Sequence, residues 1–382
     1  MKAYKFKLKP SKYIEQKLDN TLYICRELYN AGLQERRDAY RHSKISISYQ
    51  DQSKQLPEIK KTRTDLKEIN AQVVQNVLKR LDRSMDNFFG RIKKGAKEPG
   101  FPRFKGKDRY NSFTYPQAGR KGGYYLAGNK LHLSKIGKVK IFLSRPIEGT
   151  IKTCTIKREA DGWFVIFAVD EDRSPYYPKT GETTGVDVGI ENFAALTNGE
   201  MVDNPKLLCK AERKLKKAQR NLARKKLKSK NRKKAKSLVA KQHQKVARQR
   251  RDFHHKESLK LVKAYDRITF EDLNIAGLLK NHHLAKSIAD AGWNNFKLIT
   301  EAKAACAGRK FVEVPARFTS QDCSGCGNRV KKTLSEREHR CIVCGLVCHR
   351  DTNSANILDQ KGGGSACVDG RRLPRETRTC PV

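Results

Sequence analysis

Acidic side chains are scarce in this sequence. Asp and Glu total 40 against 82 Lys and Arg in 382 residues, so the formal net charge is +42. A surface this basic repels itself unless a polyanion neutralises it, which argues against an ordinary soluble enzyme without such a partner. Nucleic acid is therefore the leading partner. An anionic membrane would attract the same charge, but the sequence has no amphipathic anchor or lipidation motif.

Long hydrophobic runs are also missing. No apolar stretch approaches the ~18 residues of a membrane-spanning helix. The N-terminus alternates Lys with Tyr4, Phe6 and Leu8, which is typical of an edge strand and not of a secretory signal. We therefore expect a cytoplasmic protein that does not associate with membranes.

Cysteine occurs eleven times, in a pattern that favours metal binding over disulfides. The segments Cys323-Ser324-Gly325-Cys326 and Cys341-Ile342-Val343-Cys344 each offer two thiolates from a tight turn, as in tetrahedral zinc sites. Because thiolates fill all four positions, we expect one structural Zn²⁺ with no position open for catalysis. Cys348 and His349, just outside the pairs, are possible alternative ligands, but a fifth ligand is unnecessary and we expect both to be structural. Four isolated cysteines are expected to be packing residues: Cys25, Cys154, Cys209 and Cys306.

The first half of the chain shows two kinds of apolar pattern. A strand precedes a long amphipathic helix with Ser11 as its N-cap, and a second helical pattern runs from around Pro57 to Gly90, after a polar loop over 44–57. Residues 124–169 alternate as short strands with Gly turns, which is typical of a small barrel that the N-terminal strand can join.

The second half is typical of an α/β unit, in which short strands alternate with helices. A helix is expected over 286–307. Lys and Arg dominate residues 206–251, where Glu212 is the only acid. A break near 228–231 predicts a basic helical hairpin that follows a nucleic-acid backbone.

Three acidic residues stand in unusual places. Asp187 lies at the centre of the apolar strand Gly185–Glu191, where an unpaired carboxylate costs free energy. Glu271 ends a later strand, and Asp351 begins the last helix. Taken singly, Asp187 can cap a loop and Asp351 a helix. Taken together, they can converge and hold two Mg²⁺ ions, or Mn²⁺, for phosphodiester hydrolysis, so the sequence predicts a metal-dependent nuclease.

A basic stretch before the barrel pattern carries aromatic rings between its charges. Within Gly100–Lys105, cations suit phosphates and rings suit stacking on bases or sugars. The residues expected to contact nucleic acid here are Phe101, Arg103, Phe104 and Lys105.

Seven short motifs follow one another along the chain: Gly100–Lys105, Gly185–Gly189, Arg250–Lys256, Phe270–Leu273, Ser287–Trp293, Thr319–Gly327 and Arg350–Ile357. In this order they resemble the TnpB (OrfB) family of transposon-encoded RNA-guided DNA endonucleases, which is related to type V CRISPR effectors. The resemblance covers almost the whole chain. It departs at His349, where the family often has an acid, and at Ser354, which replaces a common Ala. The three acids remain, so we expect activity to be kept.

The resemblance implies a multidomain fold of α/β and β-barrel parts. These are an RNase H-like (RuvC) nuclease domain, an N-terminal wedge barrel with a helical recognition insert, and a zinc ribbon. Its catalytic and magnesium-binding acids fall on Asp187, Glu271 and Asp351. The implied parts are the first wedge strand at 1–10, the helical insert at 11–95, the wedge barrel at 96–180, RuvC at 181–318 with the basic hairpin at 206–263, the zinc ribbon at 319–347, the last RuvC segment at 348–360 and a flexible basic tail at 361–382.

The resemblance also implies partners. They are a guide (omega) RNA from the transposon end and double-stranded target DNA beside a short transposon-adjacent motif. The protein is then a monomer with its RNA, nucleoid-associated in a bacterium or archaeon, that helps transposon maintenance. By positional match, five residues lie near that motif and read bases or contact phosphate: Tyr49, Ser53, Gln75, Asn76 and Thr114. Two alternatives remain: a guide-RNA-dependent DNA-binding repressor that does not cut, and an RNase H-like DNA transposase.

Overall fold

The structure, a computed structural model, describes residues 1–120, 122–171, 177–333, 336–363, 367–368 and 371–372. The chain divides into two compact units, Met1–Arg173 and Ser174–Val382. Each unit has its own cluster of buried hydrophobic side chains.

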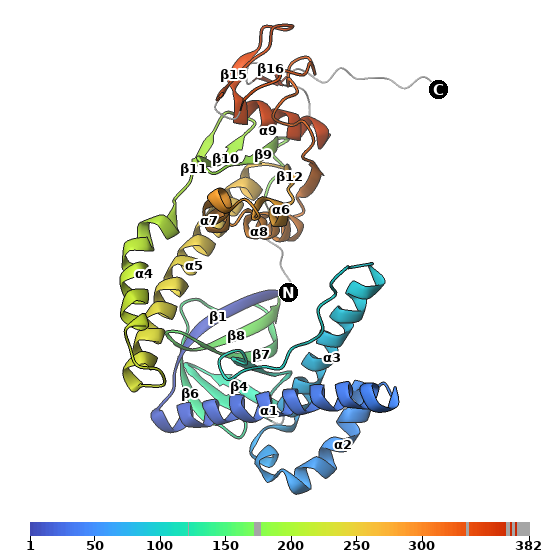
Figure 1. Ribbon diagram of the computed structural model, residues 1–382, viewed down its shortest axis with the longest axis vertical. Helices are drawn as coiled ribbons and strands as arrows, with labels where there is room; N and C mark the ends of the chain where they lie inside the picture. The colour runs from blue at the N-terminus through green and yellow to red at the C-terminus, as the bar shows by residue number, and fades with distance from the viewer. Residues whose placement is uncertain (121, 172–176, 334–335, 364–366, 369–370, 373–382) are drawn as a thin grey trace. The chain divides into compact units, whose positions relative to one another are not determined.

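An eight-stranded sheet forms the scaffold of the first unit (Figure 1). Strand β1 (Lys2–Lys9) pairs antiparallel with β6 (Gly137–Phe142) and with β8 (Gly162–Asp170). The alternation of Tyr4, Phe6 and Leu8 with lysines puts three apolar side chains on the buried face of β1. The N-terminal strand is thus paired with strands more than 130 residues away in sequence.

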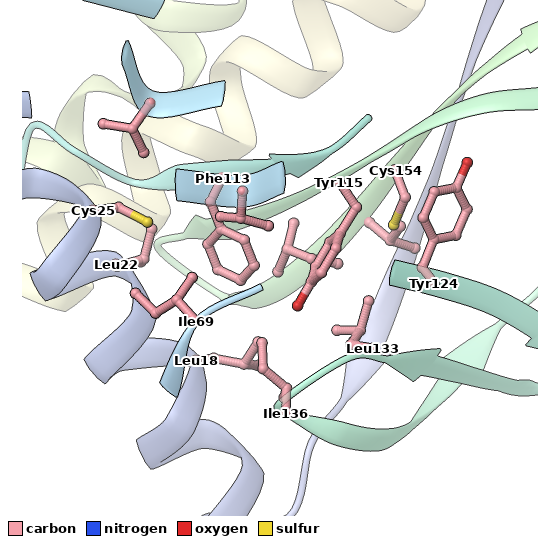
Figure 2. Close-up of a cluster of buried hydrophobic side chains, with 14 of the residues drawn as sticks. Leu18, Leu22, Cys25, Ile69, Phe113, Tyr115, Tyr124, Leu133, Ile136 and Cys154 are labelled. Atoms are coloured by element: carbon pink, nitrogen blue, oxygen red, sulfur yellow. The ribbon is translucent and has the colours of Figure 1, made fainter. Parts of the chain in front are cut away.

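The remaining strands complete a sheet that nearly closes on itself. In sheet order the strands are β2-β7-β8-β1-β6-β5-β4-β3, and β3 also contacts β7 across the gap. Figure 2 shows Phe113, Tyr115, Tyr124 and Leu133 packed with side chains of the first helix inside this curve. The strands not yet given are β2 (Ser112–Tyr115), β3 (Gln117–Ala118), β4 (Gly123–Ala127), β5 (Lys130–Leu133) and β7 (Thr150–Glu159).

Helices are inserted between β1 and β2. They are α1 (Lys12–Ser43), α2 (Tyr49–Thr62), a 3-10 turn η1 (Thr64–Glu68) and α3 (Ala71–Lys93). The predicted N-cap is confirmed, because the Ser11 hydroxyl accepts the Ile14 N–H at 3.3 Å. The predicted loop over 44–57 is wrong, since α2 begins at Tyr49 and contains Pro57.

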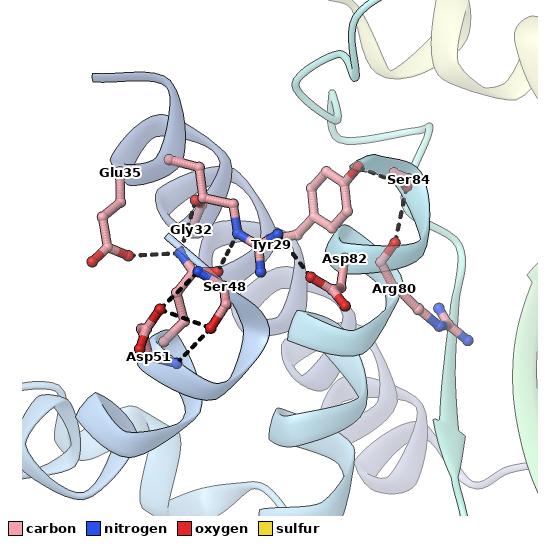
Figure 3. A network of polar contacts seen from close by, with 10 residues as sticks. Tyr29, Gly32, Glu35, Ser48, Asp51, Arg80, Asp82 and Ser84 are labelled. Atoms are coloured by element: carbon pink, nitrogen blue, oxygen red, sulfur yellow. Dashed lines mark hydrogen bonds and ion pairs between the residues drawn. The ribbon is translucent and has the colours of Figure 1, made fainter. Parts of the chain in front are cut away.

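Local capping and one buried polar network explain α2. Ser48 and Asp51 form a capping box, with the Asp51 N–H donating to Ser48 Oγ and the Ser48 N–H to Asp51 Oδ2. The Gln52 side chain is 2% exposed and donates to the Gly32 carbonyl of α1 at 2.9 Å. Figure 3 shows this network, in which polar side chains join α1, α2 and α3. A polar residue at a core position hides the helix from a search for apolar periodicity.

A five-stranded mixed sheet lies at the centre of the second unit. Its order is β11-β10-β9-β12-β13, with β9, β10 and β11 antiparallel in turn and β12 parallel to both β9 and β13. The strands are β9 (Thr183–Val188), β10 (Asn192–Leu196), β11 (Met201–Asp203), β12 (Arg267–Asp272) and β13 (Lys310–Pro315).

The helices of this unit are α4 (Leu207–Ala223), α5 (Lys230–Ala264), α6 (Ile275–Leu278), α7 (His282–Ala291), α8 (Trp293–Cys306) and α9 (Arg350–Lys361). The predicted basic helical hairpin is confirmed as α4 and α5, which pack together (Figure 1). The single helix predicted over 286–307 is two helices, because Gly292 has a φ of 65° and ends α7.

Small two-stranded sheets follow the large one: β14 (Glu338–Arg340) with β15 (Val347–His349), and β16 (Cys367–Val368) with β17 (Arg371–Arg372). Most of the predicted tail, 361–382, lies outside the described residues. No helix within the described ranges has the length and apolar character to cross a membrane. Of the isolated cysteines, Cys25 and Cys154 are buried as predicted, whereas Cys209 and Cys306 are exposed, so their assignment as packing residues is wrong.

Candidate acidic site and four-cysteine site

Asp187 and Glu271 come from neighbouring parallel strands. In the pairing of β9 with β12, Phe270 lies opposite Val186. Continuing this register by one residue brings Glu271 beside Asp187. Because side chains alternate between the two faces of a strand, the two carboxylates share one face of the sheet.

Helix α9 packs on that face so closely that its backbone touches the backbone of β9. A Cβ added to Gly185 would lie 1.9 Å from the Ala355 carbonyl oxygen of α9, so only glycine fits there. Gly362, after the end of α9, approaches Thr269 of β12 in the same way, with a Cβ placed 2.2 Å from its Oγ1. Asp187 is two residues from Gly185 and therefore also faces α9.

The three carboxylates interact electrostatically. Desolvation, followed by repulsion from Glu271 and from Asp351, raises the pKa of Asp187 well above 3.8. The Arg350 guanidinium and the Ser354 hydroxyl act in the opposite direction on this pKa. Asp187 of β9 thus lies within electrostatic range of Glu271 of β12 and Asp351 of α9, so the three predicted catalytic residues lie near one another.

Asp351 lies in the first turn of α9 and is not its N-cap. The N-cap is His349, whose Nδ1 accepts the Asp351 N–H at 3.2 Å. A carboxylate in the first turn is favoured by the helix dipole. Arg350 adds a cation, with its Nε 3.5 Å from Asp351 Oδ1.

Glu271 is held by a hydroxyl from a distant segment. Thr319 Oγ1 donates to Glu271 Oε1 at 2.6 Å. Desolvation raises the pKa of Glu271, while the Thr319 hydrogen bond and the Lys361 charge lower it. The hydrogen bond therefore favours the ionised carboxylate, the form that binds a metal ion.

The donor set suits a hard divalent cation. Three carboxylates offer only oxygen ligands. A bound cation would offset the repulsion among their negative charges, which contributes to the raised pKa of Asp187. The three do not, however, form a cluster with ligand atoms already within reach of one ion; among the described residues, the four cysteines do. An ion at the acidic site would thus require the carboxylates to move closer together or be completed by phosphate oxygens.

The four cysteine sulfur atoms all lie within 4.8 Å of one another. Cys323 Sγ is 3.6 Å from Cys344 Sγ, and Cys326 Sγ is 3.5 Å from Cys341 Sγ. Zn–S bonds of about 2.3 Å in a tetrahedron place sulfur atoms about 3.8 Å apart, so the geometry fits zinc. Backbone N–H groups of Cys344 and Val343 lower the pKa of Cys341 to about 6, whereas burial raises the pKa of Cys323 in the same cluster.

Hydrogen bonds join the turn that carries Cys323 and Cys326 to α9. Asn353 is fully buried; its amide donates to the Asp322 carbonyl at 2.8 Å and its side-chain oxygen accepts the Ser324 N–H at 2.9 Å. Gln360 donates to the Ser324 carbonyl at 2.7 Å. The segment that carries the cysteines and the helix that carries Asp351 are thus bonded directly.

Sequence patterns did not reveal the roles of Thr319, Asn353 and Ser354. Thr319 and Asn353 lie inside recognisable motifs, but their bonding partners are 48 and 29 or more residues away. Ser354 replaces a common Ala, and its hydroxyl donates to the Arg350 carbonyl at 3.1 Å and acts to lower the pKa of Asp187. Their position within motifs was the available signal.

The residues predicted to contact nucleic acid lie in the first unit, and none of them is buried. Thr114 is already engaged, since its hydroxyl accepts from Arg80 at 2.7 Å. Their contact with nucleic acid stays a prediction. The set is Tyr49, Ser53, Gln75, Asn76, Phe101, Arg103, Phe104, Lys105 and Thr114.

The aromatic loop of this set is held in place against two helices. Phe101 packs edge-on against Phe88 of α3, with ring centroids 5.2 Å apart. The Arg37 guanidinium of α1 lies 5.1 Å from the Phe104 ring centre. Asn30 bonds both backbone groups of Lys105. The loop therefore presents partly exposed rings and cations from a fixed backbone.

Family profiles match three parts of the chain. One described as a probable transposase (OrfB_IS605) matches residues 166–282, and a Cas12f1-like TNB domain matches 293–358. A third, described as a helix-turn-helix domain, matches 1–44, where the structure has one strand and one long helix.

Two relatives match almost the whole chain. A protein of Streptomyces pristinaespiralis, named "Putative RNA-guided DNA endonuclease", is 35% identical over 98% of this chain and 93% of its own length. InsQ of Escherichia coli K12, with the same description, is 29% identical over 98% of this chain and 97% of its own length. Among solved structures, a Cas12f1–sgRNA–target DNA complex matches with a TM-score of 0.57 at 14% identity, covering 91% of this chain and 83% of that one, which shows the fold alone.

These likenesses place the chain in the class of proteins related to type V CRISPR effectors. Within that class, the 35% identity along nearly its full length shows that the chain belongs to the TnpB (OrfB) family.

Proposed function

We propose that this protein is an RNA-guided DNA endonuclease whose RuvC-type, RNase H-like unit hydrolyses phosphodiester bonds at Asp187, Glu271 and Asp351. The observation that carries the proposal is that β9, β12 and α9 place Asp187 where burial, together with the charges of Glu271 and Asp351, raises its pKa. Perturbed carboxylates on adjacent strands are common at catalytic sites. The mixed five-stranded sheet and the relatives named as RNA-guided DNA endonucleases support the same assignment.

The chain's own residues would divide the work. The three carboxylates would hold two Mg²⁺ ions and align the scissile phosphate between them. When bound, the ions supply an activated water and charge stabilisation for the leaving oxygen. The Thr319 hydrogen bond favours the ionised form of Glu271, against the desolvation that raises its pKa, and fixes the carboxylate in place. The excess of Lys and Arg holds the polyanion near the site.

The proposal extends to the partners. A guide RNA from the transposon end would bind the first unit, where the Phe101–Lys105 loop presents rings and cations. A target beside a transposon-adjacent motif would then be cut by one copy of the protein with its RNA, at the nucleoid of its bacterium or archaeon, which would help the transposon persist. One Zn²⁺ at the four cysteines would be structural, because all four positions are thiolates.

The test begins with the RNA that copurifies with the protein. We expect one defined RNA, and cleavage of a target that matches its 3′ segment within a library of flanking sequences, in Mg²⁺ and not in EDTA. Asp187→Ala should abolish cleavage while target binding is kept. Cleavage by Asp187→Ala at the original rate would show the catalytic assignment to be wrong, and cleavage by RNA-free protein would contradict guiding.

A transposase is the second candidate, because the OrfB_IS605 profile carries that description. It predicts joining of transposon ends to new DNA, which the same purified protein can be assayed for with labelled ends. Strand transfer without RNA would favour this candidate, whereas RNA-dependent cleavage without transfer would favour the endonuclease. RNA-dependent binding of target DNA, without cleavage and without strand transfer, would favour a guided repressor.

A further inference from the structure

The turn that carries Cys323 and Cys326 is a tightly bonded segment. The Asp322 N–H donates to the Phe318 carbonyl at 2.9 Å, and the Cys323 N–H donates to the Asn328 carbonyl at 2.9 Å. Arg329 closes the segment from outside, with its Nε 2.9 Å from Asp322 Oδ1. Residues 318–329, which we call the first cysteine turn, are therefore joined by hydrogen bonds into one segment.

This turn reaches Glu271 on one side. Thr319 is 5% exposed, and its hydroxyl donates to the Glu271 carboxylate at 2.6 Å. A hydrogen bond this short to a carboxylate is charge-assisted and among the strong ones. The Ala316 carbonyl, 3.2 Å away, is a weaker alternative acceptor. The Thr319 hydroxyl therefore donates its single hydrogen bond to the Glu271 carboxylate in preference to the Ala316 carbonyl.

The same turn reaches the Asp351 helix on the other side. Asn353 lies two residues after Asp351 and bonds the turn through both ends of its amide, to the Asp322 carbonyl and the Ser324 N–H. Gln360, two helical turns further, adds a bond to the Ser324 carbonyl. The paired bonds on α9 fix both its distance from the turn and its rotation.

We propose that Thr319 and Asn353 are positioning residues, through which the first cysteine turn sets where the carboxylates of Glu271 and Asp351 lie. The inference rests on the proposed nuclease function of those acids. A metal site needs its carboxylates held before the ion arrives, because ordering free side chains costs free energy. The four-cysteine site would therefore contribute to catalysis without touching the substrate, by holding two acids from different elements.

Thr319→Val and Thr319→Ser test the first link. Valine keeps the shape and removes the donor, whereas serine keeps the hydroxyl. Zinc-loaded, RNA-free full-length protein is titrated with Mn²⁺, and free Mn²⁺ is followed by electron paramagnetic resonance. We expect Thr319→Val to weaken Mn²⁺ binding by about 10- to 100-fold. In protein that carries its copurified RNA, it should raise the Mg²⁺ concentration for half-maximal cleavage by a similar factor. Thr319→Ser should stay near the original protein in both measurements.

Gln360→Met tests the second link without disturbing the fully buried Asn353. It removes one neutral hydrogen bond to the turn and keeps the side-chain length, so we expect about 2- to 10-fold weaker Mn²⁺ binding with zinc content unchanged. Asn353→Ala, which removes both of its bonds, should have the larger effect. If Thr319→Val or Asn353→Ala loses zinc or folds poorly, that variant is set aside. The Mn²⁺ affinities of Thr319→Ser and Gln360→Met, compared with that of the original protein, then decide whether the positioning role holds.

The outcomes separate this inference from the proposed function. Unchanged Mn²⁺ binding in Thr319→Val and Gln360→Met would overturn the positioning role while leaving the endonuclease intact. Equal losses in Thr319→Val and Thr319→Ser would also overturn it, because the hydroxyl would not be the cause. If the original protein itself neither binds Mn²⁺ at Asp187, judged by Asp187→Ala, nor cleaves, the proposed function fails first.

Discussion

The acidic site shows a conflict between stability and function at the scale of single residues. Asp187 is placed where burial and two other carboxylates oppose its ionised form. Such an arrangement costs folding free energy in the absence of a cation and is kept at sites that bind one. Ser354 and Arg350 offset part of the cost, since both lower the pKa of Asp187.

Asp187→Asn should therefore stabilise the metal-free protein at neutral pH. The pKa of Asp187 is raised in the folded state, so between 3.8 and that raised value the folded protein binds more protons than the unfolded chain. Stability contributed by this group is thus lost as the pH rises through that window. Asparagine removes the penalty, which is about 1.4 kcal/mol for each tenfold change in the ionisation constant.

The measurement is the unfolding free energy in EDTA as a function of pH. Asp203→Asn, at an exposed position of the same sheet, is the control and should change little. The gain from Asp187→Asn should shrink as the pH falls toward 3.8. A variant less stable than the original at pH 7 would contradict the assigned repulsion.

At the scale of elements, the contact of α9 with β9 decides where the acids meet. Apolar periodicity would give α9 a buried face, but much of that face is polar. The buried polar residues are Asn353, Ser354, Asn356 and Asp359. The helix is instead held by the close approach of its backbone to Gly185 and by hydrogen bonds from the Asn353 side chain to the first cysteine turn. Its position therefore depends on the absence of one Cβ.

Gly185→Ala should separate α9 from the sheet. The new methyl group would sit 1.9 Å from the Ala355 carbonyl oxygen, and backbone must shift to relieve it. We expect a loss of about 3 kcal/mol or more of stability in thermal or denaturant unfolding, at the upper end for overpacking.

Gly90→Ala is the matched control. Gly90 lies inside α3 with nothing within 4 Å of an added Cβ. Alanine there should be neutral or stabilise by about 0.5–1 kcal/mol. A harmless Gly185→Ala would mean that α9 does not sit on β9 as described.

At the scale of the whole molecule, charge governs the affinity for nucleic acid. A net charge of +42 exceeds what any local site needs, and α4 and α5 concentrate part of it on one helical pair. Their apolar stripe is thin, with few buried residues over 52 helical positions. The exposed faces remain free to follow a phosphate backbone.

Nucleic-acid binding should accordingly weaken steeply with salt. Replacing Lys233, Lys234 and Lys241 of α5 by Gln should lower the slope of log affinity against log salt by about 0.9 for each duplex phosphate that the protein no longer neutralises, or about 0.7 for each phosphate of a single strand. Replacement of the same residues by Arg keeps the charge and should keep the slope. Equal slopes for the Gln and original proteins, measured by filter binding, would exclude α5 from the interface.

Family membership, the multidomain character and the four-cysteine cluster could be predicted from the sequence. The cysteine spacing and the pattern of strands and basic helices are local properties, and each is visible within a few tens of residues. The helix α2 was missed because its anchor is the polar Gln52, which satisfies its hydrogen bonds with α1 only after folding. The break at Gly292 was missed because a single glycine does not disturb apolar periodicity.

The sequence by itself determined the partner class and the chemistry on offer: a polyanion for the +42 charge, soft thiolates for one metal and hard carboxylates for another. Only the tertiary structure decided how these groups meet. Strand register brings Glu271 beside Asp187, the missing Cβ of Gly185 lets α9 approach, and Thr319 and Asn353 join both acids' elements to the first cysteine turn. These contacts join residues that are between 29 and 170 positions apart, and their distances follow from packing, which no local pattern encodes.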